Sequence, residues 1–163
     1  MSEAPDEGAR SATIADLDAI TDLTAEGLAE QRDGRGGAIW SVRETRAEPF
    51  ELTLREAINN PDDEVVVGTI DDVIVGYAAA RIEHLRNGQY LGVIDDIVVT
   101  PDARDVGVGE AIIKHLIAWC DRAGCVGIDS HALPGNRATK NFFETWGFKA
   151  RLLVVHRKLR DDV

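Results

Sequence analysis

Apolar and polar residues are spaced differently in different parts of the chain, and these spacings predict the secondary structure. From Ile14 to Leu28, apolar residues recur at the spacing of one buried helical face. Thr13, with Asp16 three residues later, has the spacing of a capping box, which marks a helix start. The stretch RDGRGG, residues 32–37, contains three glycines and breaks the pattern. We therefore expect an N-terminal helix followed by a mobile loop.

The middle of the chain has the pattern of strands. Pro49 first begins a second, short helix that is expected to end near residues 59–61. Three strand-like runs follow, with the sequences EVVVGTI, VIVGYAAARIEHL and QYLGVIDDIVV. Two aspartates separate the first pair of runs, and Asn87–Gly88 between the second pair is a strong hairpin signal. This region is predicted to form consecutive antiparallel strands.

The last third of the chain alternates helices and strands. Its segments are the helix VGEAIIKHLIAWCDRAG, the strand VGIDSHA, the helix NRATKNFFETW and a final strand, FKARLLVVHRKL. The predicted order is β-α-α-β-β-β-α-β-α-β, which indicates an α/β domain with a mixed, largely antiparallel sheet flanked by helices. We place this single domain at residues 11–160. The polar residues 1–10 are predicted to be disordered.

Composition and charge narrow the classes of function. The 163 residues are 44% hydrophobic and 29% charged, as in ordinary globular domains. Their net charge of −11 argues against binding to nucleic acid or anionic membranes and favours a cationic substrate; the alternative is that the acidic surface serves solubility alone. The sequence shows neither a leader nor an apolar stretch of about 18 residues, so we expect a cytoplasmic protein. Cys120 and Cys125 fit no CxxC motif and are expected to be buried thiols.

The stretch ARDVGVGEAI, residues 103–112, lies where a predicted strand becomes a helix. It lacks the third glycine or alanine of a dinucleotide-binding turn, and it lacks the Lys–Ser/Thr pair of a Walker loop. What remains is the pattern Arg104-x-x-Gly107-x-Gly109. Main-chain N–H groups and the positive end of the helix would attract an anion there, with Arg104 closing over it. The alternative is a helix start with incidental glycines.

Two segments resemble the signatures of the GNAT (Gcn5-related) N-acetyltransferases. IVVTPDARDVGVGEAI is similar to the family's acetyl-CoA-binding signature, an apolar strand and a proline-containing turn followed by Arg/Gln-x-x-Gly-x-Gly/Ala. NRATKNFFETWGF is similar to its second signature, in which an asparagine opens a helix that ends in an aromatic residue and Gly-Phe. The resemblance extends from about Ala12 to Leu159. It implies the GNAT acyl-CoA N-acyltransferase fold and transfer of acetyl from acetyl-CoA to a primary amine of a small molecule or protein.

The resemblance also implies where coenzyme A binds. The main chain of Ile97, Val98 and Val99 would pair with the pantetheine arm like an added strand. Asn136 would contact the same arm, and Phe143 would lie beside the sulfur. The pyrophosphate would be held by the turn that comprises Arg104, Asp105, Val106, Gly107, Val108 and Gly109. Asn136 also suits an ordinary helix N-cap, and Phe143 suits core packing.

Acetyl transfer to an amine requires a group that accepts a proton. An amine with a pKa near ~10.4 is mostly protonated at pH 7, so a carboxylate or imidazole must take its proton. Asp95 and Asp96 are candidates, and because adjacent strand residues point to opposite faces, only one is expected to face the substrate. The resemblance favours Asp95. His131, at the end of the strand VGIDSHA, is a third candidate. The alternatives are a structural or substrate-orienting carboxylate and a surface imidazole.

Several points stay open at the level of sequence. Many members of the family carry a tyrosine that protonates the leaving thiolate, and Phe143 stands at that position here. A non-catalytic acyl-CoA-binding sensor or scaffold, or an acyltransferase for longer acyl chains, is therefore an alternative. The resemblance places the acceptor site around the loop with Trp40 and Arg43, together with Arg151. The remaining histidines suggest no metal site, and homodimers are common in the family, although no residue identifies an interface.

Overall fold

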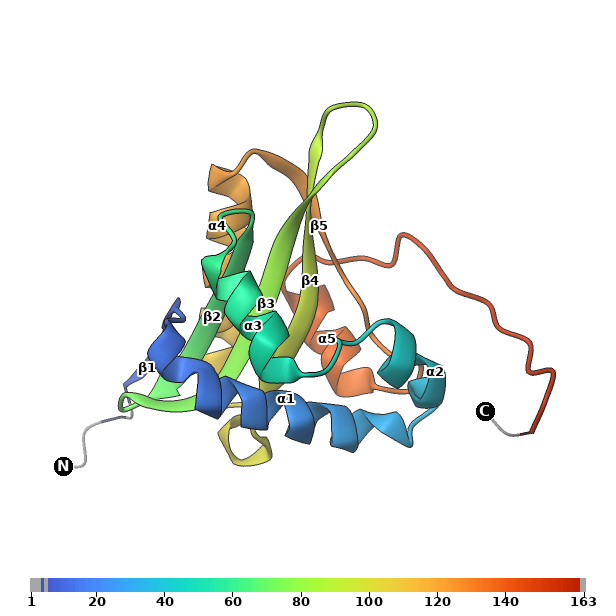
Figure 1. Ribbon diagram of the computed structural model, residues 1–163, viewed down its shortest axis with the longest axis horizontal. Helices are drawn as coiled ribbons and strands as arrows, with labels where there is room; N and C mark the ends of the chain where they lie inside the picture. Colours follow the sequence, from blue (N-terminus) through green and yellow to red (C-terminus); the bar gives the residue numbers. More distant parts are fainter. Residues whose placement is uncertain (1–3, 5, 162–163) are drawn as a thin grey trace.

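The computed structural model describes residue 4 and residues 6–161 (Figure 1). Within that part of the chain, five strands form one sheet in the order β1-β2-β3-β4-β5. They are β1 (Glu7–Ser11), β2 (Asp63–Ile70), β3 (Val73–His84), β4 (Tyr90–Val99) and β5 (Cys125–Ser130). Neighbouring strands are antiparallel except β4 and β5, which are parallel. The predicted mixed, largely antiparallel sheet is confirmed.

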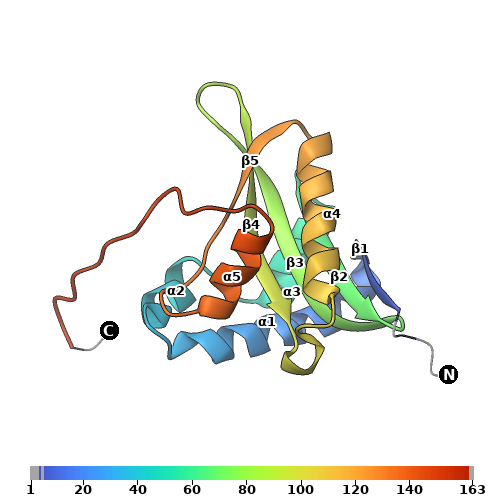
Figure 2. The ribbon, with the colours of Figure 1, turned by 180° about the vertical axis from the view of Figure 1, so that it is seen from behind.

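Helices cover both faces of the sheet (Figures 1 and 2). They are α1 (Leu17–Arg32), α2 (Gly37–Arg43), α3 (Phe50–Asn59), α4 (Val108–Arg122) and α5 (Arg137–Thr145), with short 3-10 turns at Ile14–Asp16 and Pro101–Ala103. The helices α1 and α3 lie on one face, and α4 and α5 lie on the other. None of the helices in the described residues is both long enough and apolar enough to cross a membrane.

Each face of the sheet has its own apolar core. The core under α1 and α3 includes Tyr77 and Ala79 of β3, whereas the core under α4 and α5 includes Ala78 and Ala80. Successive residues of β3 thus point alternately into the two cores, as expected for a strand covered on both sides. Burial on both faces explains why this strand is a nearly continuous apolar run.

The predicted local signals for the first helix and the central hairpins are confirmed. The Asp16 carboxylate accepts a hydrogen bond from the Thr13 N–H at 2.8 Å, which completes the capping box before α1. Hydrogen bonds from Arg10 to the same carboxylate hold the pKa of Asp16 below its usual value. At the β3–β4 hairpin, Gly88 adopts a left-handed φ of 88°, and Asn87 accepts a hydrogen bond from the Gln89 N–H.

Two expectations about the ends of the chain are wrong, and one helix was not predicted. Residues 7–10, expected to be disordered, belong to β1, because β2 offers its free edge for them to pair with; residues 1–3 and 5 lie outside the described residues. The helix α2 follows the loop at residues 32–37 and was not predicted. The expected final strand does not form, because the chain after Phe148 leaves the sheet and finds no strand to pair with in the described residues.

Candidate functional site

A cleft opens where β4 and β5 separate. The two strands are paired only as far as Ile94 and Ser130, so residues 95–99 of β4 continue without a neighbour on that side among the described strands. The cleft has a volume of about 510 Å³. On the opposite side of β4, the Thr100 N–H donates to the carbonyl of Val75 at 2.8 Å. Because main-chain groups alternate in direction along a strand, those of Ile97 and Val99 face the cleft.

The glycine turn closes one end of this cleft. Gly107 precedes the first residue of α4 with a left-handed φ of 92°, and Asp105 is also left-handed at 67°. A Cβ added to Gly107 would meet the flexible end of the Glu7 side chain, so it is the left-handed conformation that favours glycine there. Among the described residues, no side-chain hydrogen bond caps the N-terminus of α4. Its first N–H groups are therefore available to an anion.

Most of the residues predicted to bind the cofactor meet at this cleft. Those that line it are Ile97, Val98, Val99, Arg104, Asp105, Gly107, Gly109, Asn136 and Phe143. Two others do not. Val106 is exposed outside the lining, and the side chain of Val108 is fully buried against the sheet. The turn therefore presents its main chain and Arg104 to the cleft rather than its valine side chains.

Arg104 is held in place by a residue from a distant helix. Its two terminal nitrogens donate to the carboxylate of Glu30 on α1 at 2.8 and 2.7 Å, and its Nε donates to the Val99 carbonyl at 3.0 Å. These hydrogen bonds lower the pKa of Glu30. An anion bound in the turn would compete with Glu30 for the same guanidinium. Sequence reasoning missed Glu30, since it lies 74 positions away on an exposed helical face.

A β-bulge in β4 brings Asp95 and Asp96 together. Ala79 pairs with Asp96 and Ala80 pairs with Ile94, so Asp95 is the extra residue. The extra residue interrupts the alternation of faces, and both carboxylates line the cleft. The expectation that only one of them would face it is wrong for that reason.

The two aspartates nevertheless differ in their surroundings. Asp96 accepts a hydrogen bond from the Arg46 Nε at 2.6 Å, and the two side chains are only 9% and 12% exposed. Arg46 also donates to the carbonyl of Thr53 in α3 at 3.1 Å, so this arginine links Asp96 of β4 to α3. Asp96 is thus committed to a buried ion pair.

Asp95 is the more available proton acceptor. Its carboxylate lies 3.2 Å from the Arg81 Nε, and its side chain remains 33% exposed. Burial raises the pKa of Asp95, Arg81 opposes this, and the neighbouring charge of Asp96 raises it further. A carboxylate with a raised pKa holds a proton more strongly, which suits a general base.

Tyr77 of β3 also lines the cleft, although no pattern in the sequence marks it as a site residue. Its side chain is fully buried, and its hydroxyl lies 2.6 Å from the Thr24 Oγ1 of α1. Burial raises the pKa of Tyr77 well above its usual value, so the phenol stays protonated. The position of Tyr77 in the cleft was not evident from its place in the sequence or from the residues beside it.

The second signature positions α5 against the cleft. Asn136 accepts a hydrogen bond from the Thr139 N–H at 3.2 Å, which confirms the N-cap, and its amide also contacts Gln31 of α1. The Phe143 ring is buried and packs on Phe148 with the ring centroids 5.0 Å apart. Both predicted structural roles therefore hold, while both residues also border the cleft.

The residues expected near an acceptor are only partly brought together. Trp40 of α2 and the exposed His131 after β5 line the cleft. Arg43 is outside the lining but pairs with Glu44, which borders the cleft, and Arg151 pairs with Asp129 outside the lining. Within the described part of the chain, no three His, Cys, Asp or Glu side chains are grouped so that they would hold a metal ion.

With this geometry in place, comparison with known proteins decides the family. A model described as the acetyltransferase (GNAT) family matches residues 30–148, more than half of the chain, and this range contains the bulged strand, the glycine turn and α5. The chain belongs to the GNAT acetyltransferase family.

Its relatives within this GNAT family act on different molecules. The chain is 37% identical over 109 residues to a mycothiol acetyltransferase from Parafrankia sp. (strain EAN1pec), covering 67% of this chain and 29% of that protein. It is 33% identical over 92 residues to a glucosamine 6-phosphate N-acetyltransferase from Trypanosoma brucei brucei, covering 55% and 58%. The matches thus span less than two thirds of each of these relatives.

Solved structures agree with the GNAT fold. An aminoglycoside N-acetyltransferase in complex with CoA superposes with a TM-score of 0.74 at 20% identity, covering 98% of this chain and 99% of that one. At this identity the likeness concerns the fold. It confirms the predicted arrangement of a mixed sheet flanked by helices.

Proposed function

We propose that the protein is an acetyl-CoA-dependent N-acetyltransferase that acts on a primary amine. The observation that carries the proposal is that one cleft joins a glycine turn suited to an anion, the open edge of β4 and the Asp95 carboxylate. Relatives named as acetyltransferases, and the CoA in an aminoglycoside N-acetyltransferase of the same fold, support it.

The cleft fits coenzyme A in two respects. The uncapped N–H groups at the start of α4 and the guanidinium of Arg104 would hold the pyrophosphate. The main-chain groups of Val99 and the carbonyl of Ile97 would hydrogen-bond to the amides of the pantetheine arm, as if to a neighbouring strand. Bound there, acetyl-CoA supplies a thioester carbonyl that an amine nitrogen is able to attack.

Residues of the chain then accept one proton and stabilise one developing negative charge. Asp95 accepts a proton from the amine as its nitrogen bonds to the carbonyl carbon. The Ile97 N–H, which faces the cleft two residues beyond Asp95, stabilises the negative charge that develops on the carbonyl oxygen. As the carbon–sulfur bond breaks, the sulfur leaves with the bonding electrons, and a thiol with a pKa near ~8.5 is an adequate leaving group without a proton donor. Phe143 in place of a tyrosine is therefore compatible with turnover.

The acceptor is a cationic amine in this proposal. Glu44, Asp95 and Asp96 line the cleft, and each is paired with an arginine: Arg43, Arg81 and Arg46 in turn. The net charge of −11 adds long-range attraction for a cation. Trp40 and His131 line the same cleft and would contact the body of the acceptor.

The proposal is tested by calorimetric titration with acetyl-CoA, followed by an assay of thiol release with a panel of amines. We expect micromolar binding that is lost in Gly107→Trp. Gly88→Trp is the matched control, because Gly88 has an equally left-handed φ but lies in the distant β3–β4 hairpin with open space around it. Absence of binding by the unmodified protein contradicts the proposal. Binding without thiol release, whatever the amine, favours the non-catalytic sensor instead.

A further inference from the structure

The pairing of carboxylates with arginines at the cleft bears on what the acceptor must carry besides its amine. Asp95 and Asp96 line the cleft, and each lies beside one arginine, Arg81 and Arg46 respectively. An ammonium group that approaches one of these carboxylates therefore takes it from an arginine. The arginine that is released then needs another anion.

Of these two ion pairs, that of Asp95 with Arg81 is the looser. The Arg46 Nε lies 2.6 Å from the Asp96 carboxylate, whereas the Arg81 Nε lies 3.2 Å from the nearest oxygen of Asp95. The Arg81 side chain is also 42% exposed, compared with 12% for Arg46. A longer contact in a more exposed place is more easily opened, because solvent already screens it. The arginine that an acceptor displaces most readily is thus Arg81.

Much of the Arg81 guanidinium is not engaged by the rest of the protein. Its Nε is the atom that faces Asp95, and its Nη1 lies 3.8 Å from the Glu83 carboxylate. Within residues 6–161, neither terminal nitrogen of Arg81 donates a hydrogen bond. A guanidinium is a planar fork of donors that binds a carboxylate or a phosphate through paired hydrogen bonds. Such a fork lies next to the candidate general base.

Proton transfer to Asp95 would change the charges around Arg81. When Asp95 accepts the proton of the amine, its carboxylate becomes a neutral carboxyl group, and Arg81 keeps only the more distant Glu83. Before the transfer, burial raises the pKa of Asp95 and Arg81 opposes that rise. An anion bound to Arg81 would cancel this opposition, so Asp95 would hold a proton more strongly. The reaction would therefore gain from an anion at Arg81.

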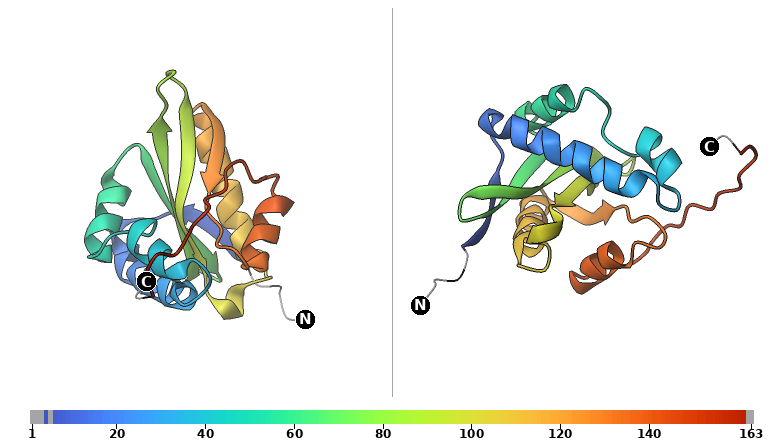
Figure 3. Two further views of the ribbon diagram at one scale, coloured as in Figure 1. Left: turned by 90° about the vertical axis from the view of Figure 1, so that its right-hand side faces the viewer. Right: turned by 90° about the horizontal axis from the view of Figure 1, so that it is seen from below.

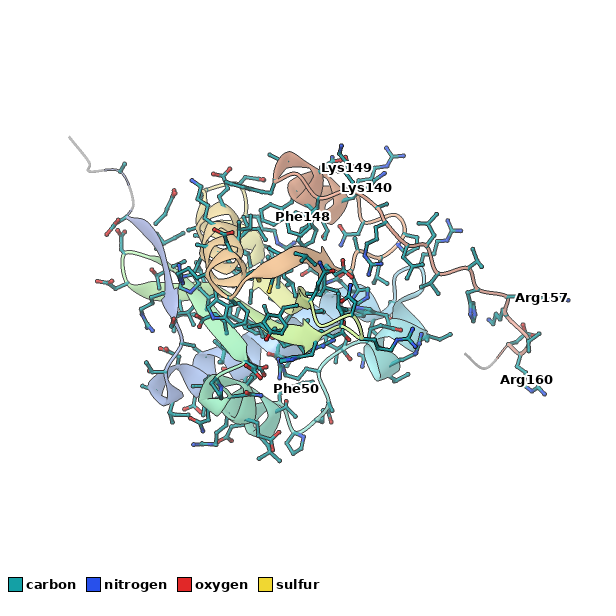
Figure 4. The ribbon with its side chains drawn as sticks, turned by 90° about the horizontal axis from the view of Figure 1, so that it is seen from above. Phe50, Lys140, Phe148, Lys149, Arg157 and Arg160 are labelled. Atoms are coloured by element: carbon teal, nitrogen blue, oxygen red, sulfur yellow. The ribbon has the colours of Figure 1, made fainter. Side chains whose placement is uncertain are left out.

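Other cations of the chain lie away from this place. Figure 4 shows Lys140 and Lys149 at α5, across the sheet from Phe50 at the start of α3. It also shows Arg157 and Arg160 far out along the chain that follows α5. Phe50 lines the cleft and packs against the core under α1 and α3. These four cations are thus unsuited to meet an anion beside the general base.

We propose that Arg81 binds an anionic group that the acceptor carries close to its amine, so that the acceptor is an amino acid or a related amine with a carboxylate or phosphate. The inference rests on the proposed acetyl transfer and names its acceptor class. Because the guanidinium of Arg81 and the carboxylate of Asp95 are in contact, the amine and the anion of the acceptor must lie only a few bonds apart.

The charge of the whole protein favours a carboxylate over a phosphate. An acceptor with one ammonium and one carboxylate has no net charge, so the net charge of −11 does not repel it. A phosphate that carries more than one negative charge leaves the acceptor anionic overall and is repelled. We therefore expect the carboxylate to be preferred.

The body of the acceptor would lie toward α2. Trp40 of α2 lines the cleft, yet it belongs to neither of the two apolar cores. Figure 3 shows α2 beside the C-terminal end of α1. An indole ring that is only partly buried and packs into neither core offers apolar surface to a bound side chain. Trp40 would thus contact the acceptor's side chain while Asp95 and Arg81 hold its charged groups.

The first test compares matched acceptors in the assay of thiol release. Glycine, β-alanine and phenylalanine are each compared with their carboxamides, and phosphoethanolamine is compared with ethanolamine. We expect kcat/KM to be about tenfold higher for the charged member of a pair, as for a charge-assisted hydrogen bond. The carboxamides have the less basic amines, so such a preference does not arise from the amine. The phosphoethanolamine pair shows whether a phosphate serves in place of a carboxylate.

The second test repeats these comparisons with Arg81→Gln. The preference for the charged member should disappear, mainly through a higher KM, while calorimetry shows unchanged binding of acetyl-CoA. Both members of a pair use the same Asp95, so a change in its basicity cancels in the ratio. Arg81→Lys keeps the positive charge and should retain part of the preference. Arg55→Gln is the matched control, because Arg55 is 44% exposed and pairs with Glu51 on α3, outside the cleft lining.

The outcomes separate this inference from the proposed function. Neutral amines that are acetylated as fast as their charged partners, or a preference that survives in Arg81→Gln, overturn the role of Arg81 and leave the acetyl transfer intact. Absence of thiol release with every amine contradicts the proposed function itself, and the inference is then wrong as well.

Discussion

The two ends of the cleft are built in different ways. The glycine end comes from one short segment, residues 104–109, and acts through main-chain N–H groups and one arginine. The carboxylate end combines residues from three parts of the chain. Asp95 and Asp96 lie at the bulge of β4. Their partners are Arg81 on the neighbouring strand β3 and Arg46 in the segment before α3. The comparison teaches that a main-chain anion site is specified locally, whereas a proton-accepting site depends on charges brought together by the fold.

The two ends also differ in how firmly their ion pairs are held. The Arg104 and Glu30 side chains are 42% and 47% exposed, so solvent screens their attraction and an anion is able to compete. Arg46 and Asp96 are nearly buried, and breaking their pair would leave an uncompensated charge. Substitutions at the carboxylate end should therefore have larger effects than substitutions at the glycine end.

The largest effect is expected for Asp95→Asn. Loss of the general base should lower kcat by about 100- to 10,000-fold, while calorimetry shows unchanged binding of acetyl-CoA. Asp63→Asn is a matched control, because burial also raises the pKa of Asp63 near the same charges, but Asp63 lies outside the cleft lining. The control should retain full turnover. Full turnover in Asp95→Asn would mean that another group accepts the proton, and His131 would then be the candidate.

Asp96→Asn should lower the stability of the fold and not the acceptance of the proton from the amine. Removal of one partner of the buried pair with Arg46 is expected to lower the free energy of unfolding by about 3 kcal/mol. Urea denaturation of this variant and of Asp95→Asn measures the difference between their free energies of unfolding. Equal stability of the two variants would show that the bulge does not give its two carboxylates separate roles.

The dependence of turnover on pH follows from the raised pKa of Asp95. Asp95 accepts a proton only when ionised, so kcat should fall as the pH drops through this pKa, by about tenfold per pH unit below it. The midpoint should lie above the ~3.9 of a free aspartate. A pH profile of kcat measures this limb. The residual kcat of Asp95→Asn should not show this fall at low pH. If the fall persists in that variant, another group is the one that titrates.

The smallest effect is expected at the glycine end, for Glu30→Gln. Without the carboxylate, Arg104 is free to bind the pyrophosphate, and acetyl-CoA should bind about two- to fivefold more tightly, since an exposed ion pair contributes ~0.2–1 kcal/mol. Glu26→Gln, exposed one turn earlier on α1, serves as the control and should bind as the unmodified protein does. Weaker binding in Glu30→Gln would indicate that Glu30 orients Arg104 for the cofactor instead of competing for it.

Several features were predictable because they depend on neighbours in the chain. The capping box of Thr13 and Asp16, the hairpin at Asn87–Gly88 and the glycine start of α4 involve contacts within a few residues, and all three are present. The order of helices and strands follows from the same local spacings, with α2 as an addition and the last strand as an exception.

Other features required the tertiary structure, because their energies come from residues far apart in the sequence. The bulge at Asp95 depends on how β3 pairs with β4, and it reverses the simple alternation that a sequence pattern assumes. Arg46 and Glu30 acquire their partners only when distant helices pack against the sheet. The strand-like C-terminal segment shows the same limit, since a strand forms only where an unpaired edge receives it. By itself, the sequence determined the helices, the hairpins and an anion-binding turn through short-range contacts. Only the tertiary structure decided which charges meet in the cleft, because long-range packing sets their distances and their exposure to water.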